Sequence, residues 1–128
     1  VLLLCFNTPL ATHLLDLLSG HDGISVFSFH KFCAFAANEA GVSVINPGND
    51  KKFFEDALPE ALLDALSAKE NLRYDAIIVD EGQDFLPQWW EPLKPCLPIR
   101  SVKSIHLWIV TSLSAPIRRP QKSGSWKW

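Results

Sequence analysis

A short apolar run that ends in a cluster of acids constrains this 128-residue chain more than any other feature. Residues 76–79 read Ala-Ile-Ile-Val, and residues 80–84 continue as Asp-Glu-Gly-Gln-Asp. β-Branched residues in an apolar run bounded by polar residues favour a buried strand. In an open parallel sheet, ligands bind beyond the carboxyl ends of the strands. The pattern therefore predicts that Asp80 lies at such an end and faces a ligand.

Strand and helix patterns alternate through the first hundred residues. Further strands are predicted at Val1–Phe6 and Ile24–Phe27, and Ala76–Val79 completes the set. Thr8 is expected to cap a helix that has Pro9 at its first position and ends before Gly20. The apolar stripe expected on this helix consists of Leu10, Leu14, Leu17 and Leu18. Alternating strands and helices predict an α/β fold, with a parallel sheet and helical crossovers.

A second helix is expected after Ser28 and should end at Gly41. The side chains predicted for its buried side are Phe29, Phe32, Cys33, Ala36 and Ala37. Residues 51–57 and 60–69 also have helical patterns, and "LPQWWEPL" is predicted to be a loop that leads into a short helix.

Composition excludes some classes of protein. With 48% hydrophobic and 20% charged residues the chain is expected to fold rather than remain disordered. Its net charge of -2 gives no overall attraction for nucleic acids or membranes. No apolar run approaches the roughly 18 residues of a membrane span. Three widely spaced cysteines fit reduced thiols, which predicts a cytoplasmic protein. The absence of methionine indicates a fragment of a longer chain.

Charge divides the chain into two parts. All 14 acidic residues lie at or before Glu91, whereas Arg100 to Trp128 contains six Lys or Arg and no acid. Residues 1–99 are therefore interpreted as part of one domain, with a boundary near residues 95–100. Residues 100–128 are interpreted as an atypical basic tail, either disordered or read out of frame. They are expected to pack poorly or to extend.

The acidic cluster has the chemistry of a nucleotide site. An Asp at the end of a strand suits Mg²⁺, which keeps several waters and takes few protein carboxylates. Glu81 could orient or deprotonate a water that attacks a phosphate. Gln83 offers both a donor and an acceptor, so it could sense a phosphate. A surface turn with helix-capping acids is the simpler alternative for these residues.

Three stretches resemble motifs of superfamily 1 DNA helicases of the UvrD/Rep type, in the order of that family. "DAIIVDEGQDF" resembles motif II, "VLLLCFNTPLA" is similar to motif Ia, and "VFSFHKFCAFA" is similar to the Thr-Phe-His-Ser motif that follows. In the last, Ser28 replaces Thr and Lys31 replaces Ser. The resemblance covers residues 1–94 and is strongest to compact bacterial helicases. It implies the first RecA-like ATPase domain (a partial P-loop NTPase sheet) without its phosphate-loop strand.

The resemblance also implies roles for individual residues. Asp80 corresponds to the Mg²⁺-binding acid and Glu81 to the catalytic base. Gln83, with Asp84, corresponds to the residues that couple the nucleotide site to the DNA. The residues that correspond to the path of single-stranded DNA are Phe6, Asn7, Leu10, Phe29 and His30. Trp89 and Trp90 could form a stacking platform, but packing or contact with a missing partner domain is the expected role for both.

The chain also departs from the family. The phosphate loop Gly-x-x-x-x-Gly-Lys-Thr does not occur in it and is expected before Val1. The second RecA-like domain with its arginine finger is missing as well. "HLWIVTSLSAPIRRP" stands where motif III is expected, and a shifted reading of residues 110–115 would permit Asp-Glu-Ser-Gln-Arg. The chain is therefore predicted to be inactive alone, with Mg²⁺, ATP, single-stranded DNA and the rest of the helicase as its partners.

Two other interpretations remain open. The chain could be a non-catalytic regulatory or partner module that keeps the fold. It could instead be an unrelated Mg²⁺-dependent phosphotransfer or nuclease domain that uses Asp80, Glu81 and Asp84.

Overall fold

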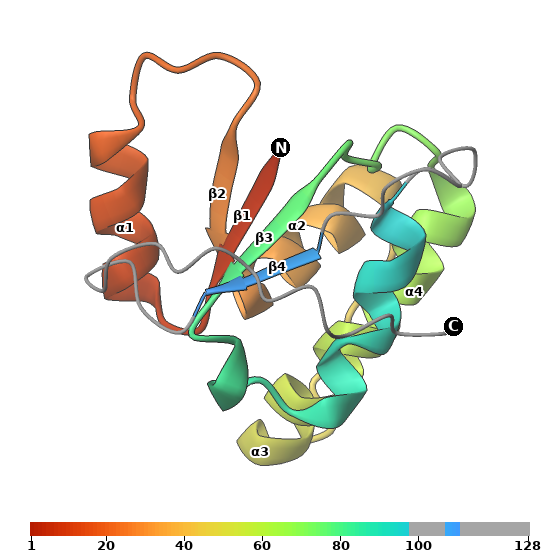
Figure 1. Cartoon of the computed structure of the whole chain (residues 1–128). Coiled ribbons are helices and arrows are strands. Elements are labelled where there is room, and N and C mark those ends of the chain that lie inside the picture. The colour runs from red at the N-terminus through yellow and green to blue at the C-terminus, as the bar shows by residue number, and fades with distance from the viewer. Residues whose placement is uncertain (98–106, 111–128) are drawn as a thin grey trace, which may run out of the picture.

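The computed structural model describes residues 1–97 and the backbone of residues 107–110. These residues form a parallel sheet with helices on both of its faces (Figure 1). The strands are β1 (Leu2–Cys5), β2 (Ser25–Ser28), β3 (Ile77–Asp80) and β4 (Leu107–Val110), in the order β2-β1-β3-β4. The predicted α/β fold with a parallel sheet is confirmed, and each of the three predicted strands agrees with the structure to within one residue at either end.

The register of the sheet brings the ends of the strands level with one another. Cys5, the last residue of β1, is opposite Ser28 of β2 on one side and Asp80 of β3 on the other. Asp80 is in turn opposite Val110 of β4. The segments that leave β1, β2 and β3 therefore start from one common edge, which we call the carboxyl rim.

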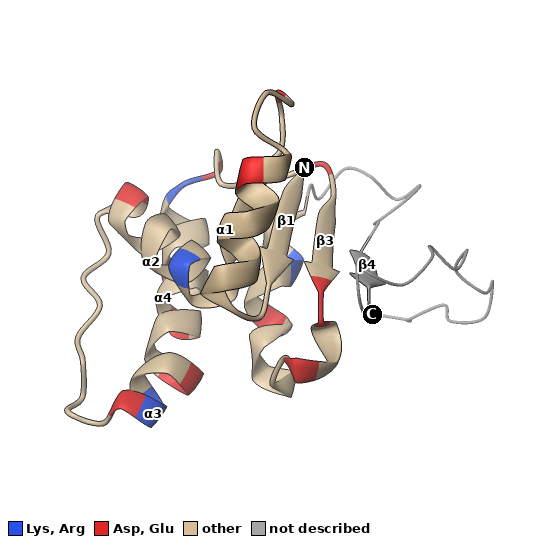
Figure 2. Cartoon of the chain, turned by 90° about the vertical axis from the view of Figure 1, so that its left-hand side faces the viewer, with Lys and Arg blue, Asp and Glu red and all other residues tan. Residues whose placement is uncertain are grey.

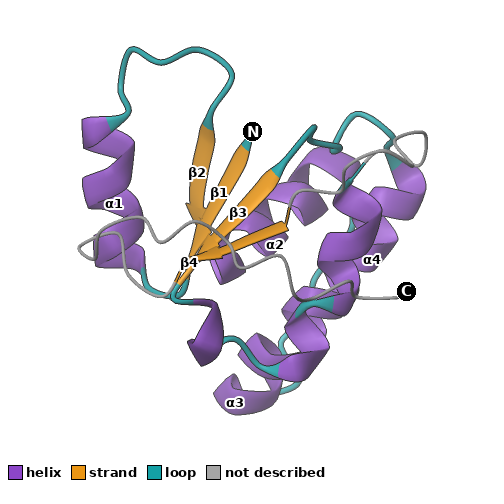
Figure 3. Cartoon of the chain, viewed as in Figure 1, coloured by secondary structure: helices purple, strands orange, loops and turns teal. Residues whose placement is uncertain are grey.

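The crossover helices lie on opposite faces of the sheet, as Figure 3 shows. α1 (Thr8–Leu17) connects β1 to β2 and packs on one face. The connection from β2 to β3 contains α2 (Phe29–Ala40), α3 (Asp50–Lys52), the π-helix η1 (Phe53–Ala57) and α4 (Leu58–Ala68). α2 and α4 pack together on the other face. Parallel crossovers are nearly always right-handed, so connections that run in opposite directions along a sheet cover opposite faces.

Each face of the sheet has its own hydrophobic core. On the face of α1, Ala11 and Leu14 meet alternate residues of β1 and β2. On the other face, Leu2 and Leu4 of β1 meet the buried sides of α2 and α4. All five residues predicted for the buried side of α2 are buried, and Gly41 ends this helix in the left-handed conformation with φ 71°.

Two local expectations about helix α1 are wrong. Asn7 caps the helix instead of Thr8, because the Asn7 Oδ1 atom accepts a hydrogen bond from the Leu10 backbone N–H at 2.9 Å. Leu17 is 62% exposed, whereas Ala11 is buried. Ala11, Leu14 and Leu18 lie on one side of the helix and pack on the sheet, whereas Leu17 lies outside this stripe.

Short 3-10 turns follow β3. They are η2 (Gly82–Asp84), η3 (Pro87–Trp89) and η4 (Glu91–Cys96). The strand β4 lies in the segment interpreted as a tail and was not predicted; it pairs in parallel with β3. The expectations for the rest of residues 100–128 concern positions outside the described residues.

In the described part of the chain no helix is long and apolar enough to cross a membrane.

Candidate functional site

Asp80 ends β3 at the carboxyl rim and is almost completely buried, with 1% of its surface exposed. Figure 2 shows the acidic residues that end β3 and follow it in red. The Asp80 Oδ1 atom accepts a hydrogen bond from the Glu81 backbone N–H at 3.1 Å. Burial, and then the charge on Glu81, raise the pKa of Asp80, while that hydrogen bond lowers it. A bound cation would stabilise this carboxylate in its ionised form.

Glu81 has an unusual backbone conformation directly after the strand. Its φ of 56° lies in the left-handed region, and it is the sole non-glycine residue with positive φ among those that the structure describes. Such a conformation costs a residue with a Cβ about 1 kcal/mol. The side chain of Gln83 donates a hydrogen bond from Nε2 to the Glu81 carboxylate. The Asp84 backbone N–H donates to the Glu81 carbonyl oxygen at 2.9 Å and closes the turn.

The turn therefore brings together three of the four predicted acidic-motif residues. Asp80, Glu81 and Gln83 are joined by the two side-chain hydrogen bonds, whereas the exposed Asp84 contributes its backbone. No group of three or more metal-ligating side chains occurs in the described residues. Mg²⁺ does not need one, because it takes one or two carboxylates and completes its shell with water and phosphate oxygens. The donor set of Asp80 and Glu81 fits this ion.

Three other residues at or next to the carboxyl rim were given no role in the site by the sequence analysis. The Cys5 thiol is buried next to Asp80 across the sheet, and burial together with the charge on Asp80 raises its pKa to about 11. The hydroxyl groups of Thr8 and Ser28 are 3.4 Å apart and connect the segments that leave β1 and β2. Cys5 and Ser28 are the last residues of their strands, and this position was the available signal.

Residues 6–10, predicted to face single-stranded DNA, occupy the exit from β1. Phe6 is 39% exposed, and its ring stacks on Trp89 with centroids 6.1 Å apart. Asn7 is exposed but its Oδ1 atom caps α1. Leu10 is half-buried and packs against the core below α1. Phe6 is thus the residue in this segment with an available aromatic surface.

The second predicted DNA-facing segment is more buried. Phe29 has no exposed surface, and its ring stacks on Trp89 at 4.9 Å. In this position the ring packs inside the core. Trp89 is 4% exposed and the half-buried Trp90 packs on Phe85, so both tryptophans pack within the chain, which is one of the two roles expected for them.

His30 is half-buried and holds a neighbouring segment. Its Nε2 atom lies 2.8 Å from the Phe54 carbonyl oxygen, which can only accept, so this nitrogen carries the proton. Burial lowers the pKa of His30, and the hydrogen bond to Phe54 partly opposes that effect. Folding therefore favours the neutral ring over the protonated one.

This pKa shift predicts a pH dependence of stability. The unfolded chain takes up the proton near the ordinary histidine pKa of about 6.5, before the folded chain does. The contribution of His30 is therefore fully present above about pH 6.5 and is lost as the pH falls through the lower pKa of the folded state. We expect His30→Gln, which keeps an N–H donor, to make the urea-unfolding midpoint depend less on pH between about pH 7 and 5. The same change at the exposed His13 should leave the pH dependence of the midpoint as it is in the wild type. The same pH dependence in both variants would contradict this prediction.

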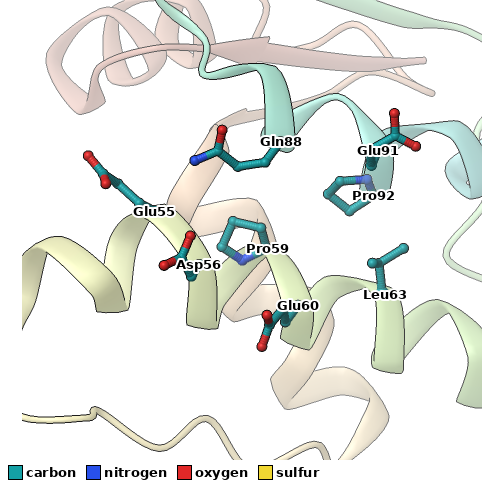
Figure 4. Close-up of a pocket in the computed structure, with 8 residues that line it drawn as sticks. All are labelled: Glu55, Asp56, Pro59, Glu60, Leu63, Gln88, Glu91 and Pro92. Atoms are coloured by element: carbon teal, nitrogen blue, oxygen red, sulfur yellow. The ribbon is translucent and has the colours of Figure 1, made fainter.

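A small pocket lies away from the acidic turn. Its cavity has a volume of about 100 Å³ and lies where η1 and α4 face η3 and η4 (Figure 4). The residues that line it are Glu55, Asp56, Pro59, Glu60, Leu63, Gln88, Glu91 and Pro92. None of them belongs to the predicted site.

Fold and rim together define an α/β protein with a parallel sheet and an acidic turn at the carboxyl end of β3. Comparisons with protein-family models, with curated proteins and with solved structures found no match. A proposal for function therefore rests on the residues and their geometry.

Proposed function

We propose that the chain is part of the first RecA-like ATPase domain of a superfamily 1 DNA helicase. The observation that carries the proposal is the acidic turn. Asp80 ends a buried parallel strand, Glu81 follows in a left-handed conformation, and Gln83 binds the Glu81 carboxylate. A surface turn with capping acids does not explain this arrangement, because Asp80 is buried and the Glu81 side chain caps no helix in the described residues.

The turn suits phosphoryl transfer from ATP. Asp80 would provide the protein carboxylate for Mg²⁺, which neutralises charge on the phosphates when it is bound. Glu81 would accept a proton from the attacking water, and Gln83 would keep its carboxylate in place. The conformational cost at Glu81 supports this role, since strained residues that persist in a fold are concentrated at functional sites.

The register of the sheet supports a coupling between a nucleotide and DNA. The acidic turn leaves β3 at Asp80, and Phe6 and Asn7 leave β1 at Cys5, its partner across the sheet. Phe6 also stacks on Trp89, which follows the acidic turn along the chain. A movement of the turn after β3 would thus be transmitted to Phe6 through its contact with Trp89. This arrangement fits a protein that couples ATP hydrolysis to a DNA strand.

The chain alone is expected to bind single-stranded DNA without hydrolysing ATP. No Gly-x-x-x-x-Gly-Lys sequence is present to cradle the β- and γ-phosphates, and positioning supplies most of the catalysis in phosphoryl transfer. DNA affinity should be of the non-specific kind, with a Kd of about 10⁻⁴ to 10⁻⁶ M that weakens with added salt.

Fluorescence anisotropy with a labelled oligonucleotide measures this binding, and phosphate release measures turnover. No binding to single-stranded DNA at low salt would refute the helicase proposal. Mg²⁺-dependent cleavage of the oligonucleotide by the chain would favour a nuclease that uses the same acids.

A further inference from the structure

An exposed phenylalanine on η1 stands apart from the residues predicted to contact DNA. Phe54 is 44% exposed, although it lies in a helical segment that could have turned it inward. Phe53 beside it packs against the core. The Phe54 ring packs edge-on against His30 and Phe53 and still leaves part of its surface in contact with water.

Two side chains fix the segment that carries Phe54. His30 donates from Nε2 to the Phe54 carbonyl oxygen at 2.8 Å. Trp89 donates from Nε1 to the Glu55 carbonyl oxygen at 3.3 Å. The π-helical geometry joins the Leu58 N–H to the Phe53 carbonyl oxygen and not to that of Phe54, which accepts from His30 instead. π-Helical turns inside longer helices occur frequently at functional sites.

Ring contacts connect Phe54 to Phe6. The centroids are 5.2 Å apart between Phe54 and His30, 4.7 Å between His30 and Trp89, and 6.1 Å between Trp89 and Phe6. We call these four residues the aromatic row. Its middle members are mostly covered, while Phe6 and Phe54 at its two ends expose their rings.

We infer that Phe54 is a further nucleic-acid contact, whose ring stacks on a base of a single strand that also passes Phe6. The inference rests on the proposed function and adds a residue from outside the helicase-like motifs. Aromatic faces bind bases of any sequence, and positive charge beside them attracts the phosphates. Lys51 and Lys52 provide that charge, because both are exposed and, with the acidic Asp50, form α3 directly before Phe53. The acidic Glu55 and Asp56 instead line the pocket of Figure 4.

The test compares variants of the present chain in anisotropy titrations with a labelled single strand. Phe54→Ala should weaken binding at least about fivefold, as expected for one lost base stack. Phe54→Leu, which keeps apolar bulk and should preserve the fold, should weaken binding to a similar degree, while Phe54→Trp should bind like the wild type. Phe35→Ala is the matched control, since Phe35 is 37% exposed and stacks on Phe27 at 5.1 Å, outside the aromatic row. An oligonucleotide without bases should bind wild type and Phe54→Leu equally.

The outcomes separate this inference from the proposed function. If wild type binds the single strand and Phe54→Leu binds equally well, the inference is wrong and the proposed function stands. If wild type does not bind, the proposed function fails and the inference with it. If Phe54→Leu keeps its affinity for DNA but no longer associates with the rest of the helicase, Phe54 contacts protein and the inference is overturned.

Discussion

Replacing Glu81 by Gln in the complete helicase that we propose is expected to lower DNA-stimulated ATP turnover about 100-fold or more. A general base typically contributes factors of about 10² to 10⁴. Gln has nearly the shape of Glu but cannot accept the proton from water. ATP binding should persist, because Asp80 and the phosphate loop would still hold the nucleotide. Phosphate release at saturating ATP, Mg²⁺ and single-stranded DNA measures turnover, and equilibrium binding of a fluorescent ATP analogue measures affinity.

Glu70→Gln is the matched control for this substitution. Glu70 is exposed, precedes β3 and lies outside the acidic turn, so the same loss of charge there should leave turnover unchanged. Wild-type turnover by the Glu81→Gln protein would show that Glu81 is not the base. Robust hydrolysis by the chain of 128 residues alone would show that the catalytic site has been misplaced.

Phe29→Ala should lower the free energy of unfolding by about 3 to 5 kcal/mol, which is the usual cost of removing a buried aromatic ring. Phe29 has no exposed surface and contacts Trp89, Phe85 and His30, so its loss leaves a cavity between α2 and the turns after β3. Urea unfolding followed by circular dichroism measures the change.

Phe35→Ala provides the comparison, because more than a third of Phe35 is already in contact with water. Its cost should be clearly smaller than that of Phe29→Ala. If Phe29→Ala keeps wild-type stability and loses affinity for DNA, then Phe29 serves the nucleic acid and not the core.

The strands could be predicted from the sequence because their apolar runs are short and bounded by turn residues. Asp80 could be placed at a strand end for the same reason, and Gly41 could be recognised as the end of α2. These features depend on residues close together in the chain. The helix cap at Asn7 was missed because Asn, Thr and Pro in succession offer more than one possible start, and only the packed structure selects among them.

The aromatic row could not be predicted, since it joins residues from four separate segments. No periodicity links Phe6 to Trp89 or His30 to Phe54, and the hydrogen bonds that hold η1 come from side chains far away in sequence. The burial of Phe29 has the same origin. Its neighbours in the sequence match a DNA-facing motif, but its position under Trp89 depends on the turns after β3.

The order of the strands has one more consequence. β1 and β3 are neighbours, yet the chain leaves β1 toward the face covered by α1 and leaves β3 toward the face covered by α2 and α4. Such a divergence is a topological switch point, the place where open α/β sheets accommodate their ligands. Phe6 and Glu81 begin the two diverging segments. A nucleotide at this junction would therefore lie between the acids after β3 and the segment that starts at Phe6, so that one ligand could influence both.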